Sequence, residues 1–358
     1  MRHARYIWTL LAVAVIPVVL LAGVNLLVDP YEVFRTHLFS EVGATQERYL
    51  KVEHLKQHPG FDTFLMGGSR MGTAVPEEIE AVLPGHRVYN FFVSSGNQYD
   101  NLVHARWLLR TRPAIKRIFV QVDWPESYGP SVENPQYLTH PEVLGNSGLG
   151  FLRNYLFTFS YAAIEFKLMN NRSRRGEFQL PLEAGYFRYP ERDRLIAGDC
   201  AGHVRQVPAF SFPVTAAMPS PAQKKLNEQS LQALAQLVAS AGRHGTQVTV
   251  FVTPHHRRFL DKINADEYAD FLQDLARITP YWSFGFYSPL TTDDCNYYET
   301  SHYIAKVAPL LFSAMSGTAP GTYVRHVNRD NARDEADFVI KNFLAHRTPA
   351  AAQGEPAK

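Results

Sequence analysis

The sequence predicts an α/β protein whose mostly parallel sheet is covered by helices on both faces, behind an N-terminal transmembrane helix. An apolar run without charges lies near the N-terminus, and short apolar runs alternate with helical stretches after residue 60. Polar clusters follow several of the apolar runs. Strands and helices that alternate over short links are typical of a three-layer parallel sheet.

The composition is that of an ordinary globular protein. The chain has 358 residues, of which 46% are hydrophobic and 20% charged, and its formal net charge is +2. These values exclude disordered and fibrous classes. The sequence has no stripe of lysine and arginine interleaved with aromatics, so we expect no nucleic-acid partner.

Residues 7–28 carry no charge and, at 1.5 Å per residue, extend over about 33 Å, enough for a single membrane span. Arg2 and Arg5 precede this run, so the positive-inside rule keeps the N-terminus cytoplasmic and exports the rest of the chain. The alternative is a cleaved signal peptide. The run is long for a signal peptide, and no small-residue cleavage site precedes Asp29, which favours an uncleaved anchor.

The pattern of apolar and polar residues divides the chain into three parts. We expect a membrane anchor at 1–28, an α/β domain at 29–320 and a C-terminal helix with a tail at 321–358. Strands are expected at 61–67, 86–91, 116–123 and 245–254, with a weak one at about 282–287. Helices are expected at 76–83, 98–111, 222–241, about 259–277, from His302 onward, and at about 329–346. Residues 124–220 lose this rhythm and predict an irregular insertion or cap.

The chain contains two cysteines, Cys200 and Cys295. An exported domain permits one disulfide between them. Two buried, unpaired thiols are an equal alternative, because the sequence does not show how closely the two Cα atoms approach.

Ser69 is the first candidate for chemistry. It lies in the segment Leu-Met-Gly-Gly-Ser-Arg-Met-Gly, directly after an expected strand, at the sheet edge where ligands bind in such folds. The glycines permit a tight turn, and the amide groups of Ser69 and Arg70 can point at an oxyanion. The alternative is an anion-binding turn or a plain glycine-rich connection.

Glu299 and His302 form the second candidate. They are three residues apart, before an expected apolar helix, and one helical turn would point both side chains the same way. A carboxylate that orients a histidine, which takes the proton of a serine, is the logic of a catalytic triad. The alternative is a helix-capping pair. Asp293 and Asp294 are second choices for the orienting acid.

A serine after the first strand and an acid-x-x-His after the last resemble the SGNH/GDSL hydrolase superfamily, which implies a flavodoxin-like sheet. The blocks around 67–70, 89–90, 122–123 and 301–303 are similar to anchored SGNH-like proteins of bacterial envelope-polysaccharide clusters. The likeness covers about 60–123 and 245–315, and does not cover the insertion. It implies Ser69 as nucleophile, His302 as base, and Glu299 where the superfamily has Asp.

The oxyanion-binding blocks depart from the superfamily pattern. The second block is usually Asn-x-x-x-x-Gly, and here Asn90 is followed by a glycine one position late, Gly96. Ser95 or Gly96 could supply the amide, and Asn97 a side-chain donor. The third block, Gly-x-Asn-Asp, is absent, and Asp123 occupies its place. A carboxylate cannot donate to an oxyanion unless it is protonated, and the loss of one such donor costs about 2.7–4 kcal/mol.

Asn90, Asp123, His255 and His256 remain as candidates for substrate contact at the same edge of the sheet. The adjacent histidines could also lie in a solvated loop. A metal site is not expected, because neighbouring histidines on a loop point apart and the sequence has no second Cys/His cluster. No cofactor is expected.

The resemblance implies a serine-dependent acyl-ester hydrolase or O-acyltransferase acting on a cell-envelope polysaccharide. Its catalytic domain would face the periplasm from a single-pass anchor in the bacterial inner membrane, with a membrane acyl-donor protein as a further partner. The alternative is a catalytically inactive SGNH-fold protein that binds polysaccharide or an assembly partner. The missing third block and the Asp-to-Glu change favour that alternative.

Overall fold

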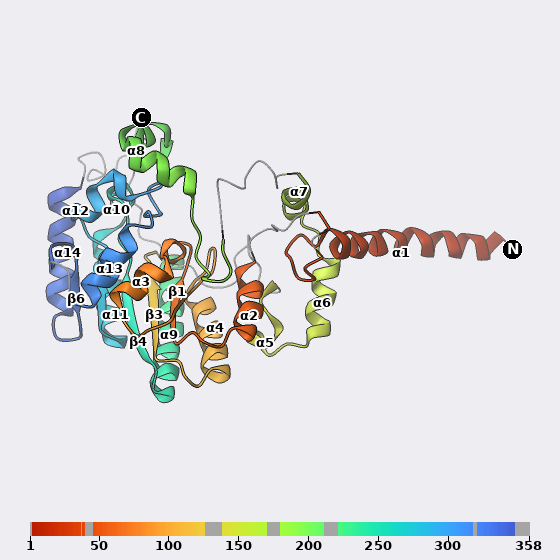
Figure 1. Ribbon diagram of the computed structural model, residues 1–358, viewed down its shortest axis with the longest axis horizontal. Helices are drawn as coiled ribbons and strands as arrows, with labels where there is room; N and C mark the ends of the chain where they lie inside the picture. Colours follow the sequence, from red (N-terminus) through yellow and green to blue (C-terminus); the bar gives the residue numbers. More distant parts are fainter. Residues whose placement is uncertain are drawn as a thin grey trace. The chain divides into compact units, whose positions relative to one another are not determined.

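The computed structural model describes residues 2–36, 38–39, 46–125, 138–169, 180–210, 221–317 and 321–347 (Figure 1). They form two compact units. Unit 1 consists of Met1–Gln57 and Pro130–Gly176, and unit 2 of His58–Gly129 and Glu177–Lys358. These boundaries differ from the expected ones: the anchor segment joins part of the insertion, and the C-terminal segment joins the sheet.

Unit 1 is helical. Its helices are α1 (Arg2–Val28), α2 (Glu47–Gln57), α5 (Pro141–Leu144), α6 (Gly148–Phe157) and α7 (Tyr161–Met169). Within α1, Arg5–Val28 is long and apolar enough to cross a membrane, and little of it is buried by the protein. The expected N-terminal apolar helix is therefore present.

Unit 2 is built on a six-stranded sheet. The strands are β1 (Thr63–Gly67), β2 (Val88–Phe92), β3 (Arg117–Val122), β4 (Gln247–Val252), β5 (Tyr281–Ser283) and β6 (Arg325–Val327). Their order is β2-β1-β3-β4-β5-β6, and only the β5–β6 pair is antiparallel. The prediction of a mostly parallel α/β sheet is confirmed. The order 2-1-3-4-5 of the parallel strands is one of the two common doubly wound orders.

Helices α3 (Pro76–Val82) and α13 (Val307–Met315) pack on one face of this sheet, in a core that includes Leu65, Phe119 and Phe251 (Figure 1). Pro76 lies in the first turn of α3, followed by two glutamates, which suits a helix N-terminus. The alternation of side chains along each strand leaves a second apolar face for other helices.

Helix α4 (Gln98–Thr111) covers that second face. Its His104 ring lies 5.1 Å from the ring of Phe91, whose neighbour Phe92 belongs to the first core. Helix α4 also packs on α9 (Pro221–His244), and α11 (Ala265–Ile278) packs on α14 (Ala332–His346). Helices on both faces of the sheet follow from this arrangement.

Several expected elements are placed differently. The insertion at 124–220 is not irregular throughout, because it contains α5, α6, α7 and α8 (Pro190–Gln206). Strand β6 was not predicted. Helix α13 begins at Val307 instead of His302, since residues 297–303 form a loop closed by a bridge between Tyr297 and Tyr303.

A disulfide joins Cys200 in α8 to Cys295, with the Cα atoms 5.7 Å apart. Cys295 lies in the short 3₁₀ turn η4 (Asp294–Asn296). The two alternatives left open by the sequence are thus resolved in favour of a disulfide.

Candidate active site

Ser69 lies in a tight turn between β1 and the 3₁₀ turn η1 (Met71–Thr73). The two preceding glycines have no room for a side chain. A Cβ on Gly67 would come within 2.6 Å of the Gln121 side chain, and one on Gly68 within 3.1 Å of the Gly96 carbonyl oxygen. The turn can therefore sit against both neighbouring strand ends, with Ser69 at the carboxyl edge of the sheet.

Glu299 and His302 lie in the loop between Tyr297 and Tyr303. The Tyr298 amide donates to the His302 carbonyl at 2.9 Å, which closes the loop. The residues are not helical, so the expectation that one helical turn aligns them is wrong. A hairpin-like loop brings the two side chains to the same side instead.

The loop brings the imidazole to the serine. Ser69 Oγ lies 2.7 Å from His302 Nε2, although 233 residues separate the two in sequence. His302 Nδ1 is hydrogen-bonded to Glu299 Oε1, and the Ser301 amide donates to Glu299 Oε2 at 2.7 Å. The serine, the imidazole and the carboxylate thus form one continuous hydrogen-bonded chain.

Glu299 is held in its charged form. Burial raises the pKa of its carboxyl group, but the hydrogen bonds from His302 and from the Ser301 amide outweigh burial and lower that pKa below its usual value. A charged carboxylate can keep the Nδ1 proton of the imidazole in place and leave Nε2 free to accept.

The other two acids weighed for this role lie elsewhere. Asp294 Oδ1 lies 2.8 Å from His256 Nε2, and Asp294 also forms an ion pair with Arg257. Asp293 accepts from the Cys295 amide as the N-cap of η4.

Arg70 connects the Ser69 turn to the loop that carries His302. Its Nε donates to the Ser301 carbonyl at 2.9 Å and its Nη2 to Ser301 Oγ at 2.7 Å. Its Nη1 donates to Asp123 Oδ2 at 2.9 Å. Two planar N–H groups on one residue fix both distance and angle, so Arg70 fastens the loop one residue before the imidazole.

Asp123 is the centre of a second network at the end of β3. Besides Arg70, it accepts hydrogen bonds from the Gln121 side chain and from Thr253 Oγ1. Burial raises the pKa of Asp123, but Arg70 and the two hydrogen bonds reverse that effect and lower it. Asp123 is therefore a carboxylate that anchors Arg70 and cannot donate to an oxyanion.

His255 lies beside this network. Its Nε2 is 3.8 Å from Asp123 Oδ1, and its ring stacks on Phe259 at a centroid distance of 4.2 Å. Both ring nitrogens are buried and form no hydrogen bond among the described residues. Burial, followed by the nearby charge of Arg70, lowers the pKa of His255 to about 3, so the ring is neutral at pH 7.

The candidate oxyanion donors divide into two groups. Among the residues the structure describes, the backbone N–H groups of Ser69 and Arg70 form no hydrogen bond. The Gly96 N–H, in contrast, donates to the Val93 carbonyl at 2.8 Å, so the expectation that it serves an oxyanion is not met in this conformation. Of the described candidate donors, the Ser69 and Arg70 amides are therefore the ones left unbonded next to the Ser69 hydroxyl in sequence.

Asn97 and Ser95 occupy turn positions next to that glycine. The Asn97 side-chain oxygen accepts from the Tyr99 and Asp100 amides, so the residue is the N-cap of α4. Ser95 is exposed and has a φ of 51°, in the left-handed region. It marks the apex of the turn between β2 and α4.

Two of the residues expected to contact substrate are structural instead. The buried Asn90 amide donates to the Met71 and Ala74 carbonyls, both at 2.8 Å, and so holds the backbone after Ser69. His256 is buried, paired with Asp294, and its Nδ1 accepts the Arg258 amide. Neither side chain is accessible to a ligand.

Ser301, Gln121 and Phe259 complete the site and were missed by sequence reasoning. Ser301 could have been noticed, because it directly precedes the proposed base. No motif marks Gln121 or Phe259. No group of three or more His, Cys, Asp or Glu side chains among the described residues is arranged to hold a metal ion.

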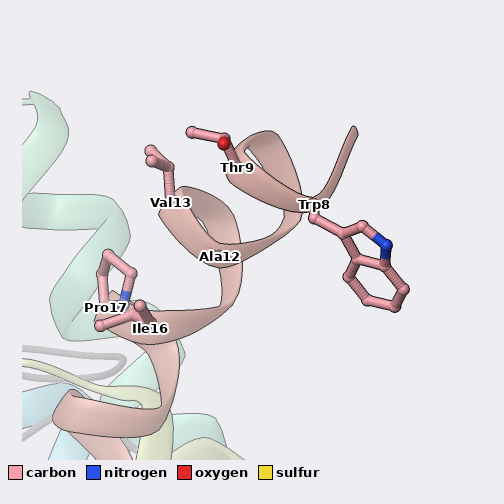
Figure 2. Close-up of a pocket in the computed structure, with 6 residues that line it drawn as sticks. All are labelled: Trp8, Thr9, Ala12, Val13, Ile16 and Pro17. Carbon is pink, nitrogen blue, oxygen red and sulfur yellow. The ribbon is translucent and has the colours of Figure 1, made fainter. Parts of the chain in front are cut away.

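A hollow also lies along α1, lined by Trp8, Thr9, Ala12, Val13, Ile16 and Pro17 (Figure 2). All six residues belong to one apolar helix, and none of them is titratable. We assign this hollow no chemistry.

Comparison with known proteins adds no identification. No protein-family model matches the chain, and no curated protein matches it significantly.

Proposed function

We propose that this protein is a serine-dependent acyl-ester hydrolase or O-acyltransferase of the SGNH type. The observation that carries the proposal is the 2.7 Å contact between Ser69 Oγ and His302 Nε2, with Glu299 on the other nitrogen of the same ring. A hydroxyl in contact with an imidazole that a carboxylate orients is the geometry of nucleophilic acyl chemistry.

In this mechanism His302 Nε2 takes the proton of Ser69 while Ser69 Oγ attacks the acyl carbonyl carbon. The resulting oxyanion is stabilised by the free N–H groups of Ser69 and Arg70. When the intermediate collapses, the His302 proton passes to the leaving alcohol, and an acyl-serine remains. Water then gives hydrolysis and a sugar hydroxyl gives acyl transfer, each activated by His302.

The substrate we propose is a cell-envelope polysaccharide outside the cytoplasmic membrane, which hydrolysis would deacylate and transfer would acylate. Support comes from the apolar helix α1, with Arg5 at its N-terminal end, and from the disulfide, which requires an oxidising compartment. We place the catalytic unit in the periplasm of a bacterium, on a single-pass inner-membrane anchor, with a membrane acyl-donor protein as a partner if transfer is the reaction.

Labelling with a fluorophosphonate probe tests the chemistry. The full-length protein in detergent should be labelled, Ser69→Ala should not be, and Ser316→Ala is a matched control, since Ser316 is an exposed serine in the same unit. Unlabelled wild-type protein that unfolds cooperatively on heating would contradict the proposal. Mass measurement of the labelled peptide identifies the serine.

A second candidate function is a non-catalytic protein that binds polysaccharide or an assembly partner. Two observations favour it: the Gly96 amide is already bonded to Val93, and Asp123 stands where the superfamily has a donor. The two candidate functions differ in the labelling experiment. A binding protein would not be labelled even as wild type, and its Ser69→Ala variant would retain affinity for the glycan.

A further inference from the structure

The C-terminal end of α1 is tied to the end of α6 by one side chain. The Asn25 amide donates to the carbonyl oxygens of Tyr155, Leu156 and Thr158, at 3.2, 2.8 and 2.9 Å. These are carbonyls at the end of α6 that lack partners within the helix. Helices α6 and α7 both contact α1, and Figure 1 shows them at its C-terminal end.

This attachment determines how the end of α6 lies relative to the membrane that α1 is proposed to cross. The segment Arg5–Val28 has 24 residues, or about 36 Å at 1.5 Å per residue, whereas the hydrocarbon core of a bilayer is about 30 Å thick. Asn25 is within one turn of the helix end, so it lies at the polar boundary of the membrane. The end of α6 must then lie at the same boundary.

Further contacts make the connection rigid. The Tyr155 hydroxyl donates to Asp29 Oδ1 at 2.7 Å, and the same carboxylate accepts the Val33 amide at 2.9 Å. Tyr31 donates to Ser160 Oγ at 3.1 Å. The segment after α1 and the corner between α6 and α7 are therefore held together by buried polar groups.

The corner between α6 and α7 exposes large apolar side chains. Phe159 is 65% exposed and Tyr161 is 64% exposed, and both are large aromatic side chains between or at the start of the helices. The exposed large apolar residues of α6, α7 and their junction are Leu149, Phe157, Phe159, Tyr161 and Leu168. Such a group on the surface of a protein marks a contact with another molecule or with lipid.

We propose that the corner formed by residues 157–161 lies in the headgroup layer of the membrane that α1 crosses. Aromatic side chains are enriched at this depth, where an apolar ring and a polar edge are both satisfied. The corner is hydrogen-bonded to the end of the membrane-spanning helix through Asn25, and this proximity identifies lipid as its occupant. The inference rests on the proposed membrane anchor and is independent of the acyl chemistry.

Site-specific fluorescence in lipid nanodiscs tests this placement. Because the only two cysteines are joined in a disulfide, an introduced cysteine is the only free thiol. Phe159→Cys and Tyr161→Cys are each labelled with an environment-sensitive dye. Gln57→Cys is the exposed control in the same unit, at the end of α2, which Figure 1 shows farther from α1 than α6 is, and Val15→Cys reports on α1 itself.

With nitroxide-labelled lipids, we expect the dyes at positions 159 and 161 to emit at shorter wavelength and to be quenched severalfold more than the dye at 57. Quenching no stronger than at 57 would overturn the proposal, as would a blue shift without lipid quenching, which would mean that a protein surface or a second copy covers the corner. Loss of quenching at position 15 would instead refute the anchor, and the proposal with it.

Discussion

Arg70 holds Ser301 through two hydrogen bonds, to its carbonyl oxygen at 2.9 Å and to its hydroxyl at 2.7 Å. Ser301 directly precedes His302, and Arg70 directly follows Ser69. The two partners of the proposed proton transfer are thus joined a second time, through their sequence neighbours. Because Asp123 also holds the guanidinium, the Ser69 turn, the end of β3 and the His302 loop are fixed to one another.

Arg70→Lys should lower activity without unfolding the protein. Lysine keeps a positive charge near Asp123 but cannot donate to both Ser301 acceptors from one planar group. Small displacements of reacting groups cost up to about 100-fold in rate, and we expect a loss of about 10- to 100-fold, mainly in kcat. The rate of fluorophosphonate labelling and ester hydrolysis measure it.

Arg277→Lys is the control for that substitution, because Arg277 is exposed and distant in sequence from the site. It should leave the labelling rate unchanged. Full activity in Arg70→Lys would show that the contacts to Ser301 do not position His302. Ser301→Ala, which removes one acceptor and keeps the carbonyl, should give a smaller loss than Arg70→Lys.

Glu299→Gln should strongly reduce kcat while preserving the shape of the site. The neutral amide can donate to Nδ1 and so favour the tautomer that cannot accept the serine proton, and in other serine triads the equivalent change costs up to about 10⁴-fold. Glu299→Asp keeps the charge but shortens the side chain by one methylene, so we expect an intermediate rate. A Gln variant as active as wild type would contradict the assignment of Glu299.

The lowered pKa of Glu299 predicts the direction of pH dependence. Its carboxylate stabilises the fold above the ordinary carboxyl pKa, and this contribution is lost as the pH falls through the lower value of the native state. Thermal unfolding as a function of pH should show acid destabilisation that is weaker in Glu299→Gln than in wild type. Equal acid sensitivity of the two proteins would show that this carboxylate is not held by the contacts described.

Most of the sheet could be predicted because most of its strands have a recognisable pattern in the local sequence. Strands β1, β3 and β4 are short apolar runs bounded by turn residues, and α4 was predicted with its bounds as found, Gln98–Thr111. Strand β6 has three residues, Arg-His-Val, and is defined by its pairing with β5 rather than by any pattern of its own. The helices of the insertion were missed because the alternation of apolar runs and helical stretches stops in that segment.

The candidate site was likewise predictable only in part. Ser69, Glu299 and His302 could be chosen from motifs, because their types and spacings are informative before folding. The oxyanion donors could not be predicted, because whether the Gly96 amide is free depends on the turn that bonds it to the Val93 carbonyl. Asn90 was expected to contact the substrate, but its side-chain amide donates to the carbonyls of Met71 and Ala74. These hydrogen bonds form only once the turn after Ser69 is folded.

His255→Phe should make the fold less sensitive to acid. The native ring stays neutral down to a pKa of about 3, whereas the unfolded chain takes up a proton near 6.5. Between these values stability therefore falls as the pH falls, by up to about 1.4 kcal/mol per pH unit. Phenylalanine keeps the stack on Phe259 and removes this proton uptake.

The measurement is the unfolding midpoint of wild type and variant between pH 7 and pH 4. We expect the difference in stability between the two proteins to shift in favour of His255→Phe as the pH is lowered. His326→Gln, at an exposed histidine, should follow the wild-type curve. Parallel curves for wild type and His255→Phe would mean that His255 is not held neutral in the native state.

The disulfide between Cys200 and Cys295 should stabilise the loop that carries the acid and the base. Helix α8 holds this loop at two further places: Tyr298 is hydrogen-bonded to Asp193, and His203 lies 3.2 Å from the Tyr297 carbonyl. The cysteines are 95 residues apart, and disulfides typically contribute about 2–4 kcal/mol, with the larger values expected for long loops. Replacing both cysteines by serine should lower the unfolding midpoint accordingly.

Activity should fall only in part, because the two non-covalent contacts between α8 and the loop remain. Treatment with a reductant should lower the stability of the wild type to that of the double serine variant and leave the variant unchanged. If reduction lowers stability but not the rate of labelling at Ser69, the disulfide supports the fold without positioning His302. If it changes neither, α8 holds the loop through Asp193 and His203 alone.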